Sequence, residues 1–170
     1  MEKIKWGIIG PGNIANNFAD GLKGSYSGQL VSIASKSEDR RKNFGDKYDI
    51  HPDFRFDSYE DIINSEHIDA IYISTPHTLH AQWTIKAAGK GKHILCEKPG
   101  AINFNEGKKI IDAVREAGVF YMEGFMYRCH PQIPKLVDII KNKIIGDVIS
   151  VETSFGFDMG KTIPDHRLFN

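Results

Sequence analysis

The sequence is poor in cysteine, has no excess of either charge, and contains no apolar run long enough to cross a lipid bilayer. The two cysteines, Cys96 and Cys129, have no motif spacing, which excludes a disulfide framework. The chain also lacks the apolar core and cleavage site of a signal peptide near its N-terminus. A reduced, cytoplasmic protein without a membrane partner is therefore expected.

Charge and metal-ligand patterns exclude two further classes of function. Lys+Arg and Asp+Glu number 22 each, so no basic field points to nucleic acid. The histidines, cysteines and carboxylates are not grouped at metal-ligand spacing, so we expect no catalytic metal. What remains is an ordinary globular composition, with 41% apolar and 26% charged residues over 170 positions.

The most informative stretch lies at the start of the chain. Ile4 to Ile9 reads as a short buried strand, and a helix is predicted to begin near Asn13. Between them, small residues follow the spacing G-x-G-x-x-A of a dinucleotide-binding turn. Gly10 can take the backbone angles of a tight turn, Gly12 has no Cβ and lets a pyrophosphate approach the main chain, and Ala15 lets the helix pack close to the strand. The free N–H groups at the start of the helix attract the phosphate charge. The predicted phosphate-binding residues are Gly10, Pro11, Gly12, Asn13 and Ile14. The alternative is an ordinary strand–turn–helix.

The end of the second predicted strand, Gln29 to Ser35, indicates which dinucleotide is preferred. NAD-binding folds usually place a carboxylate there, to bond the ribose 2′-hydroxyl. This chain has Ser35-Lys36-Ser37 instead, with Arg40 one turn into the next helix. Hydroxyls and cations suit a 2′-phosphate, so we predict NADP. NAD stays possible because Glu38 and Asp39 are close, and the cations could simply be solvated.

Strand and helix patterns alternate along most of the chain. A buried strand is predicted at 68–74 and further strands at 93–96 and 119–123. Helices are predicted to begin at Ser37, Ser58 and Asn103. This alternation predicts a doubly wound parallel sheet, the Rossmann type of α/β fold. Residues 1–123 are therefore interpreted as an NAD(P)-binding domain.

Residues 124–170 follow another pattern. A helix with apolar Ile133, Leu136 and Ile140 is followed by strict alternation from Ile149 to Phe157. That alternation is typical of a strand with one wet face. Because nothing after it can pair with it, we interpret 124–170 as a connecting helix and the first strand of a truncated α+β domain.

Further candidate site residues follow the later strands, where ligands bind in a doubly wound sheet. Thr75, Pro76 and His77 are predicted to lie beside the nicotinamide end of the cofactor, and His80 lies one turn further on. A histidine in such a position is more often a packing or surface residue than a catalyst.

Glu97 and Lys98 follow the strand at 93–96. Hydride transfer from an alcohol requires a group that accepts the hydroxyl proton, and a lysine in a dry cleft can do so. Lys98 is the catalytic candidate, and Glu97 is a candidate for cofactor contact. The alternative is a surface Glu–Lys pair, which would contribute little.

Three segments together resemble the glucose–fructose oxidoreductase/inositol dehydrogenase family, Gfo/Idh/MocA. They are Gly7-Ile-Ile-Gly-Pro-Gly-Asn-Ile-Ala15, Ser74-Thr-Pro-His-Thr-Leu-His80 and Gly91-Lys-His-Ile-Leu-Cys-Glu-Lys-Pro99. Met126-Tyr-Arg-Cys-His-Pro131 resembles the segment leading to the family's second domain. The resemblance implies a nicotinamide-dependent oxidoreductase acting on a sugar, polyol or related small molecule. It also implies a catalytic Lys98, with Arg128 near the nicotinamide or substrate.

The sequence departs from the family pattern in two ways. The family often has asparagine where this chain has His77. Its members also carry a second domain with a further acid/base residue and a sheet that commonly forms the subunit interface. Only the start of that domain is represented here, in a stretch ending with Asp165-His-Arg-Leu-Phe169. We therefore expect a cofactor-binding fold with little turnover alone, and a homo-oligomer at full length.

Two other classes share the glycine turn. A non-catalytic nucleotide-binding module or redox sensor would bind the dinucleotide but would have no use for Lys98. A methyltransferase-like fold is also conceivable, but Glu97-Lys98-Pro99 argues against it.

Overall fold

The computed structural model describes residues 2–156. These residues belong to two compact units, Met1–Met126 and Tyr127–Asn170. The first contains β1 (Ile4–Ile9), α1 (Asn13–Lys23), β2 (Gly28–Ala34), α2 (Glu38–Lys47), β3 (Arg55–Phe56), α3 (Tyr59–Asn64), β4 (Ala70–Ile73), α4 (His80–Ala88), β5 (His93–Cys96), α5 (Phe104–Ala117) and β6 (Tyr121–Glu123). Short 3₁₀ turns occur at η1 (Pro52–Phe54), η2 (His77–Leu79) and η3 (Met126–Cys129), and α6 covers Gln132–Lys141.

The sheet has the strand order β3-β2-β1-β4-β5-β6, and every neighbouring pair is parallel. The prediction of a doubly wound parallel sheet is thus confirmed. The strand order reverses between β1 and β4, which is where such sheets bind ligands. Sequence reasoning did not locate β3, because two residues are too short to show a period.

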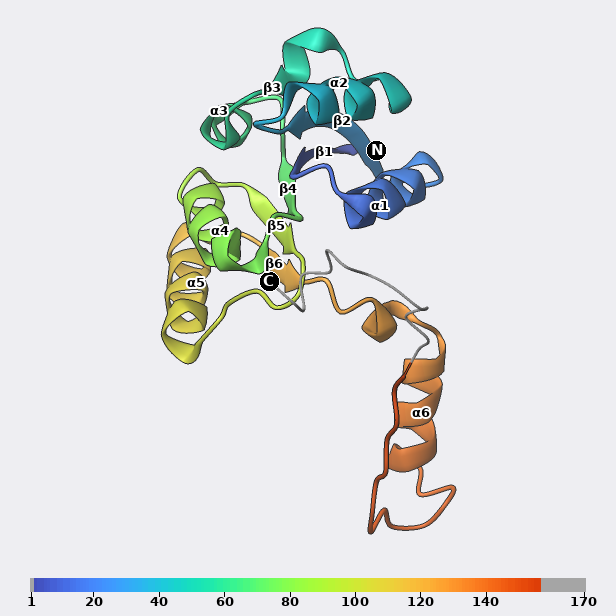
Figure 1. Ribbon diagram of the computed structural model, residues 1–170. Coiled ribbons are helices and arrows are strands. Elements are labelled where there is room, and N and C mark those ends of the chain that lie inside the picture. Colours follow the sequence, from blue (N-terminus) through green and yellow to red (C-terminus); the bar gives the residue numbers. More distant parts are fainter. Residues whose placement is uncertain (1, 157–170) are drawn as a thin grey trace. The chain divides into compact units, whose positions relative to one another are not determined.

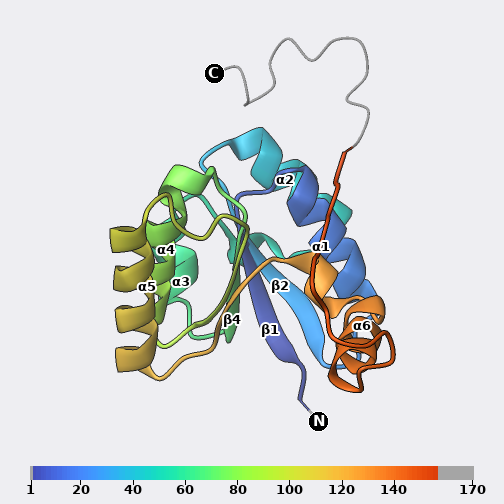
Figure 2. The ribbon, with the colours of Figure 1, turned by 90° about the horizontal axis from the view of Figure 1, so that it is seen from below.

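Helices cover the two faces of this sheet unequally. Figure 2 shows α3, α4 and α5 on one side of the sheet and α1 and α2 on the other. Adjacent residues of β1 serve the two faces: Ile8 packs with Ala15 and Phe44, whereas Ile9 packs with Ile62 and Trp83. Strands buried on both faces explain why the sequence shows continuous apolar runs here.

The predicted helix starts are confirmed by their capping bonds. Ser37, Ser58 and Asn103 each accept a backbone N–H of the helix that follows. Glu106 bonds back to the N–H of Ile102, one residue before the predicted partner of the capping box. Gly118 ends α5 with φ of 64°, a left-handed conformation that favours glycine.

The strand expected at 149–157 is not formed among the described residues of the second unit. Residues 149–156 have no regular structure, and Phe157 lies outside the described residues. Ile149 and Phe155 are 97% and 93% exposed. A strand needs a hydrogen-bonding neighbour, and no segment of the described chain pairs with this one, so the alternating pattern alone does not produce a strand. The stretch 165–169 also lies outside the described residues.

Within the described part of the chain, no helix is long and apolar enough to cross a membrane. Cys96 is buried, Cys129 is exposed, and both are free thiols.

Candidate nucleotide-binding site

In the glycine turn after β1, Gly10 has a positive φ, a backbone conformation that is strained for residues other than glycine. Gly10 has φ of +91°, and a Cβ added there would lie 3.1 Å from the carbonyl oxygen of Ser74. The Ser74 hydroxyl donates to the Gly10 carbonyl at 2.7 Å. The turn is therefore tied to the end of β4, at the point where the strand order reverses.

Gly12 has a different role from Gly10. Its backbone is extended, with φ of −91° and ψ of −172°, and an added Cβ would meet no atom within 4 Å. Gly12 is the N-cap of α1, which has neither a side-chain cap nor an acidic residue in its first turn. The first N–H groups of this 11-residue helix, at Asn13 and Ile14, are consequently available to an anion. Pro11 lies half-buried between the two glycines.

The residues at the end of β2 divide into anchored and exposed groups. Ser35 is buried, and its hydroxyl accepts the N–H of Ser37 at 3.2 Å. Arg41 donates to the Ser35 carbonyl at 2.7 Å, so this arginine holds the turn. Lys36, Ser37 and Arg40 are exposed. Neither Lys36 nor Arg40 forms an ion pair with another described residue, which leaves two cations at the mouth of the turn.

The loop after β4 presents one unsatisfied polar atom. Thr75 is buried, yet its Oγ1 has no hydrogen-bond partner among the described residues. Buried hydroxyls are usually bonded, so this one is a candidate contact for a ligand. Pro76 and His77 are exposed beside it.

His80 lies behind this loop rather than in it. Its ring is 2% exposed, with Nδ1 2.7 Å from the Pro99 carbonyl and Nε2 2.8 Å from the Thr75 carbonyl. Both ring nitrogens are thus engaged by backbone oxygens. The predicted contact of this imidazole with a cofactor would require one of these bonds to break.

The carboxylate of Glu97 is turned toward the sheet. Its Oε1 accepts the hydroxyl of Tyr72 at 2.6 Å, and the Tyr72 ring stacks on Phe18 of α1. Burial, and then the hydrogen bond to Glu97, raise the pKa of Tyr72 far above its usual value, so the phenol stays protonated and donates. A chain of contacts therefore connects the helix of the glycine turn with the segment after β5.

Lys98 is exposed at the end of β5, and its peptide bond to Pro99 is cis. The carboxyl ends of β1, β4 and β5 lie at one edge of the sheet, so Lys98 and Gly12 share that edge with only β4 between their strands. The dry surroundings that a catalytic lysine requires are not supplied by this unit. They would have to come from a bound cofactor and from further protein.

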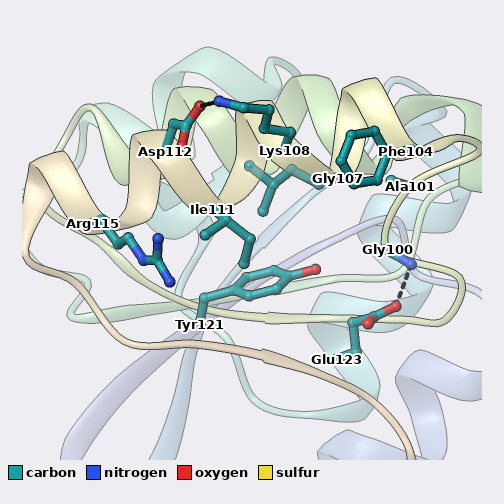
Figure 3. A pocket seen from close by; sticks show the side chains of 11 residues that line it. Gly100, Ala101, Phe104, Gly107, Lys108, Ile111, Asp112, Arg115, Tyr121 and Glu123 are labelled. Carbon is teal, nitrogen blue, oxygen red and sulfur yellow. Dashed lines mark hydrogen bonds and ion pairs between the residues drawn. The ribbon is translucent and has the colours of Figure 1, made fainter.

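The segment after Lys98 is held in place by β6, the strand next to β5. The Glu123 carboxylate of β6 accepts the N–H of Gly100 at 2.6 Å (Figure 3). The Tyr121 hydroxyl lies so close to Gly100 that an added Cβ would collide with it. A glycine is thus required at position 100, because the Tyr121 and Glu123 side chains approach its backbone closely. Sequence reasoning missed this contact because it joins a loop to a strand residue 23 positions away.

A cavity of about 620 Å³ runs along α5 and the edge strand β6. Its lining includes Phe104, Ile111 and Arg115. It meets the candidate site at Gly100 and at the Tyr121 and Glu123 side chains that contact Gly100 (Figure 3). Gly12, Thr75 and Lys98 do not line it. At the proposed cofactor edge, Gly12, His77 and Lys98 are exposed. Among the described residues, no group of three or more histidines, cysteines or carboxylates could hold a metal ion.

The strand order, the glycine turn with its open helix N-terminus, and the orphan hydroxyl at the switch point together define a dinucleotide-binding domain of the Rossmann type (Figure 1). A family profile described as "Oxidoreductase family, NAD-binding Rossmann fold" (GFO_IDH_MocA) matches residues 4–125. The chain belongs to this family.

Relatives of known name agree with that assignment. The chain is 33% identical to trans-1,2-dihydrobenzene-1,2-diol dehydrogenase of Xenopus tropicalis, over 92% of this chain and 48% of the relative. It is 32% identical to D-xylose 1-dehydrogenase (NADP(+)) 2 of Haloferax volcanii, over 97% and 50% of the respective chains. The fold superposes on the 3-ketoreductase KijD10 from Actinomadura kijaniata in complex with NADP, with a TM-score of 0.76, 31% identity, and coverage of 85% and 46%. The chain therefore spans about half the length of these relatives.

Proposed function

We propose that this chain is the cofactor-binding portion of an NADP-dependent oxidoreductase that transfers hydride to or from a sugar, polyol or related hydroxy compound. The observation that carries the proposal is the open N-terminus of α1 beside Gly12, at the same sheet edge as Lys98. The N–H groups at the start of α1 suit a pyrophosphate, and the Lys98 side chain suits proton transfer. The named relatives, which act on a diol, a sugar and a keto group, support the class of substrate.

Each part of the edge has a proposed task. The N–H groups after Gly12 bind the pyrophosphate, while Lys36, Ser37 and Arg40 contact the 2′-phosphate. Thr75 Oγ1 offers a hydroxyl at the nicotinamide end, next to Pro76 and His77. Bound nicotinamide supplies the hydride acceptor or donor. Lys98 Nζ holds the proton of the reacting hydroxyl, accepting it during oxidation and returning it during reduction. Arg128 belongs to the second unit, and its contact with the cofactor or substrate stays a prediction.

We also propose that further protein completes the substrate pocket and the subunit interface of a cytoplasmic homo-oligomer. Relatives twice as long as this chain, and the exposure of Lys98, support a missing substrate wall. The 170-residue chain would then bind NADP(H) but show little turnover. Titration of this chain with NADPH and NADH tests the expected binding, and assays with sugars and polyols test the expected low turnover. Failure to bind either nucleotide would refute the proposed cofactor-binding function. Rapid substrate-dependent reduction of NADP would refute the claim that further protein is needed to complete the substrate pocket.

The second candidate is a nucleotide-binding module or redox sensor without catalysis. The exposed position of Lys98 in the described unit is the observation that favours it. Binding of NADPH does not separate the two candidates, because both require it. Turnover in the complete protein separates the two candidates, because only the enzyme should lose turnover when Lys98 is replaced.

The predicted preference for NADP can be tested at Arg40. We expect Arg40→Ala to weaken NADPH binding about tenfold, because a charge-assisted hydrogen bond to phosphate contributes about 1.5 kcal/mol or more. NADH binding should change less than about twofold. Lys42→Ala removes an exposed cation from the same helix and serves as the control. Equal losses for NADPH and NADH would contradict a 2′-phosphate contact, as would an equal effect of the control.

A further inference from the structure

The Tyr72 ring is held in a fixed orientation between β4 and α1. The residue is 2% exposed, and its ring stacks on Phe18 of α1 with centroids 4.1 Å apart and planes inclined by 27°. Phe18 in turn contacts Trp6 of β1 edge to face, at 5.2 Å. These contacts involve only the ring, so a phenylalanine at position 72 would make them equally well. Ring packing therefore does not explain the hydroxyl of Tyr72.

The Tyr72 hydroxyl has one hydrogen-bond partner among the described residues, the carboxylate of Glu97. It donates to Glu97 Oε1 at 2.6 Å, the short distance expected when a hydroxyl donates to a carboxylate. The same oxygen lies against the backbone after β6, because a Cβ added at Gly124 would be 3.1 Å from it. One oxygen of Glu97 is thus held between a residue of β4 and the segment that follows β6.

The second oxygen of Glu97 is left for another donor. Within residues 2–156, Oε2 accepts no hydrogen bond and the carboxylate forms no ion pair. Glu97 is half-buried, and each oxygen of a carboxylate can accept hydrogen bonds. Because Glu97 follows β5, this oxygen belongs to the sheet edge that also carries Gly12 and Lys98.

The strand order assigns that donor to one half of the proposed dinucleotide. Lys36 and Arg40 follow β2 and the N–H groups after Gly12 follow β1, so the proposed positions of the 2′-phosphate and pyrophosphate lie on one side of β4. Glu97 follows β5, on the other side of β4. A carboxylate repels phosphates and accepts from neutral donors, so it suits a ribose hydroxyl on the nicotinamide half.

We propose that Tyr72 is a positioning residue that holds Glu97 by Oε1 and leaves Oε2 to accept a ribose hydroxyl on the nicotinamide half of a bound dinucleotide. This role rests on the proposed function, because it requires the nucleotide at this edge. Tyr72 is covered by Phe18 and does not itself reach the nucleotide. Its hydroxyl acts through Glu97: the bond selects one orientation of the carboxylate, so nucleotide binding need not order that side chain.

The first test measures the dissociation constants of NADPH and of adenosine 2′,5′-bisphosphate, which lacks the nicotinamide half, for the 170-residue chain. We expect Tyr72→Phe to weaken NADPH binding about fivefold and Glu97→Met to weaken it about tenfold. The double variant should bind no more weakly than Glu97→Met, because Tyr72 acts only through Glu97. Binding of the bisphosphate should change less than about twofold in all three variants.

Tyr48→Phe is the matched control, because it removes another tyrosine hydroxyl from the same face of the sheet, one that donates to Asn16. It should bind NADPH like the wild type. Equal losses for NADPH and the bisphosphate in Tyr72→Phe would overturn the positioning role, as would unchanged NADPH affinity or additive losses in the double variant. A wild-type chain that binds neither ligand would overturn the proposed function, and the positioning role with it. The other failures leave nucleotide binding intact, so they are distinguishable from this one.

The second test examines the contact without nucleotide, by urea denaturation of the same variants. Glu97→Met should lower the urea midpoint, because it leaves the buried phenol of Tyr72 without a partner. Adding Tyr72→Phe removes that phenol, so the double variant should regain part of the loss. A double variant less stable than Glu97→Met would show that the hydroxyl and the carboxylate do not depend on one another, and would overturn the proposal.

Discussion

Gly12→Val is expected to weaken NADPH binding at least about 100-fold while lowering the free energy of unfolding by no more than about 1 kcal/mol. The backbone at Gly12 has φ of −91°, which valine tolerates, and an added Cβ meets no atom within 4 Å. The side chain would therefore occupy the space in front of the α1 N–H groups without disturbing the fold. Isothermal titration and urea denaturation of the same preparations measure the two quantities.

Gly10→Ala is the matched comparison, because the same turn and the same residue type are changed. At Gly10 the φ of +91° and the contact with Ser74 make any side chain strained, so the free energy of unfolding should fall by about 1–3 kcal/mol. Loss of binding in this variant would follow from the distorted turn. If Gly12→Val bound NADPH normally, no pyrophosphate could lie across this helix N-terminus, and the central proposal would be wrong.

These two glycines show how far local sequence predicts this site. The spacing of Gly10, Gly12 and Ala15 between an apolar strand and a helix is a local signal, and it located the turn between β1 and α1 correctly. The capping residues Ser37 and Asn103 were predictable for the same reason, since a side chain bonds the backbone two or three residues away. The motif also assigned the tight-turn backbone to Gly10 and the close approach of a phosphate to Gly12, and the first assignment is confirmed by the φ of +91° at Gly10. Sequence could not show that Ser74 contacts Gly10, because the two residues are 64 positions apart.

The rest of the site depends on contacts between distant segments. His80 was predicted as a candidate cofactor contact, but the structure shows its ring occupied by carbonyls on two loops, one of them 19 residues away. The bond from Tyr72 to Glu97 and the bond from Gly100 to Glu123 join residues more than 20 positions apart. The periodicity of apolar residues cannot predict hydrogen bonds between residues so far apart in the sequence. The strand expected from Ile149 does not form among the described residues for a related reason, because a strand needs a hydrogen-bonding neighbour that the pattern does not supply.

Lys98→Met in the complete enzyme is expected to lower kcat about 1,000-fold and to change the dissociation constant of NADP⁺ less than about threefold. The loss follows because methionine fills similar space but can neither accept the hydroxyl proton nor stabilise charge on oxygen. Lys98→Arg separates these two tasks: arginine restores the positive charge, but it stays protonated and cannot act as the base. It should recover little of the rate during alcohol oxidation.

Lys90→Met provides the control for Lys98→Met, because Lys90 is also exposed but lies in the turn after α4, away from the carboxyl ends of the strands. Stopped-flow measurement of nicotinamide absorbance, with binding followed separately by fluorescence, distinguishes loss of chemistry from loss of cofactor. A normal rate in Lys98→Met would remove the catalytic role and leave the nucleotide-binding module as the better reading. A slow rate with intact binding would exclude that module, because a sensor without chemistry has no step for this lysine to accelerate.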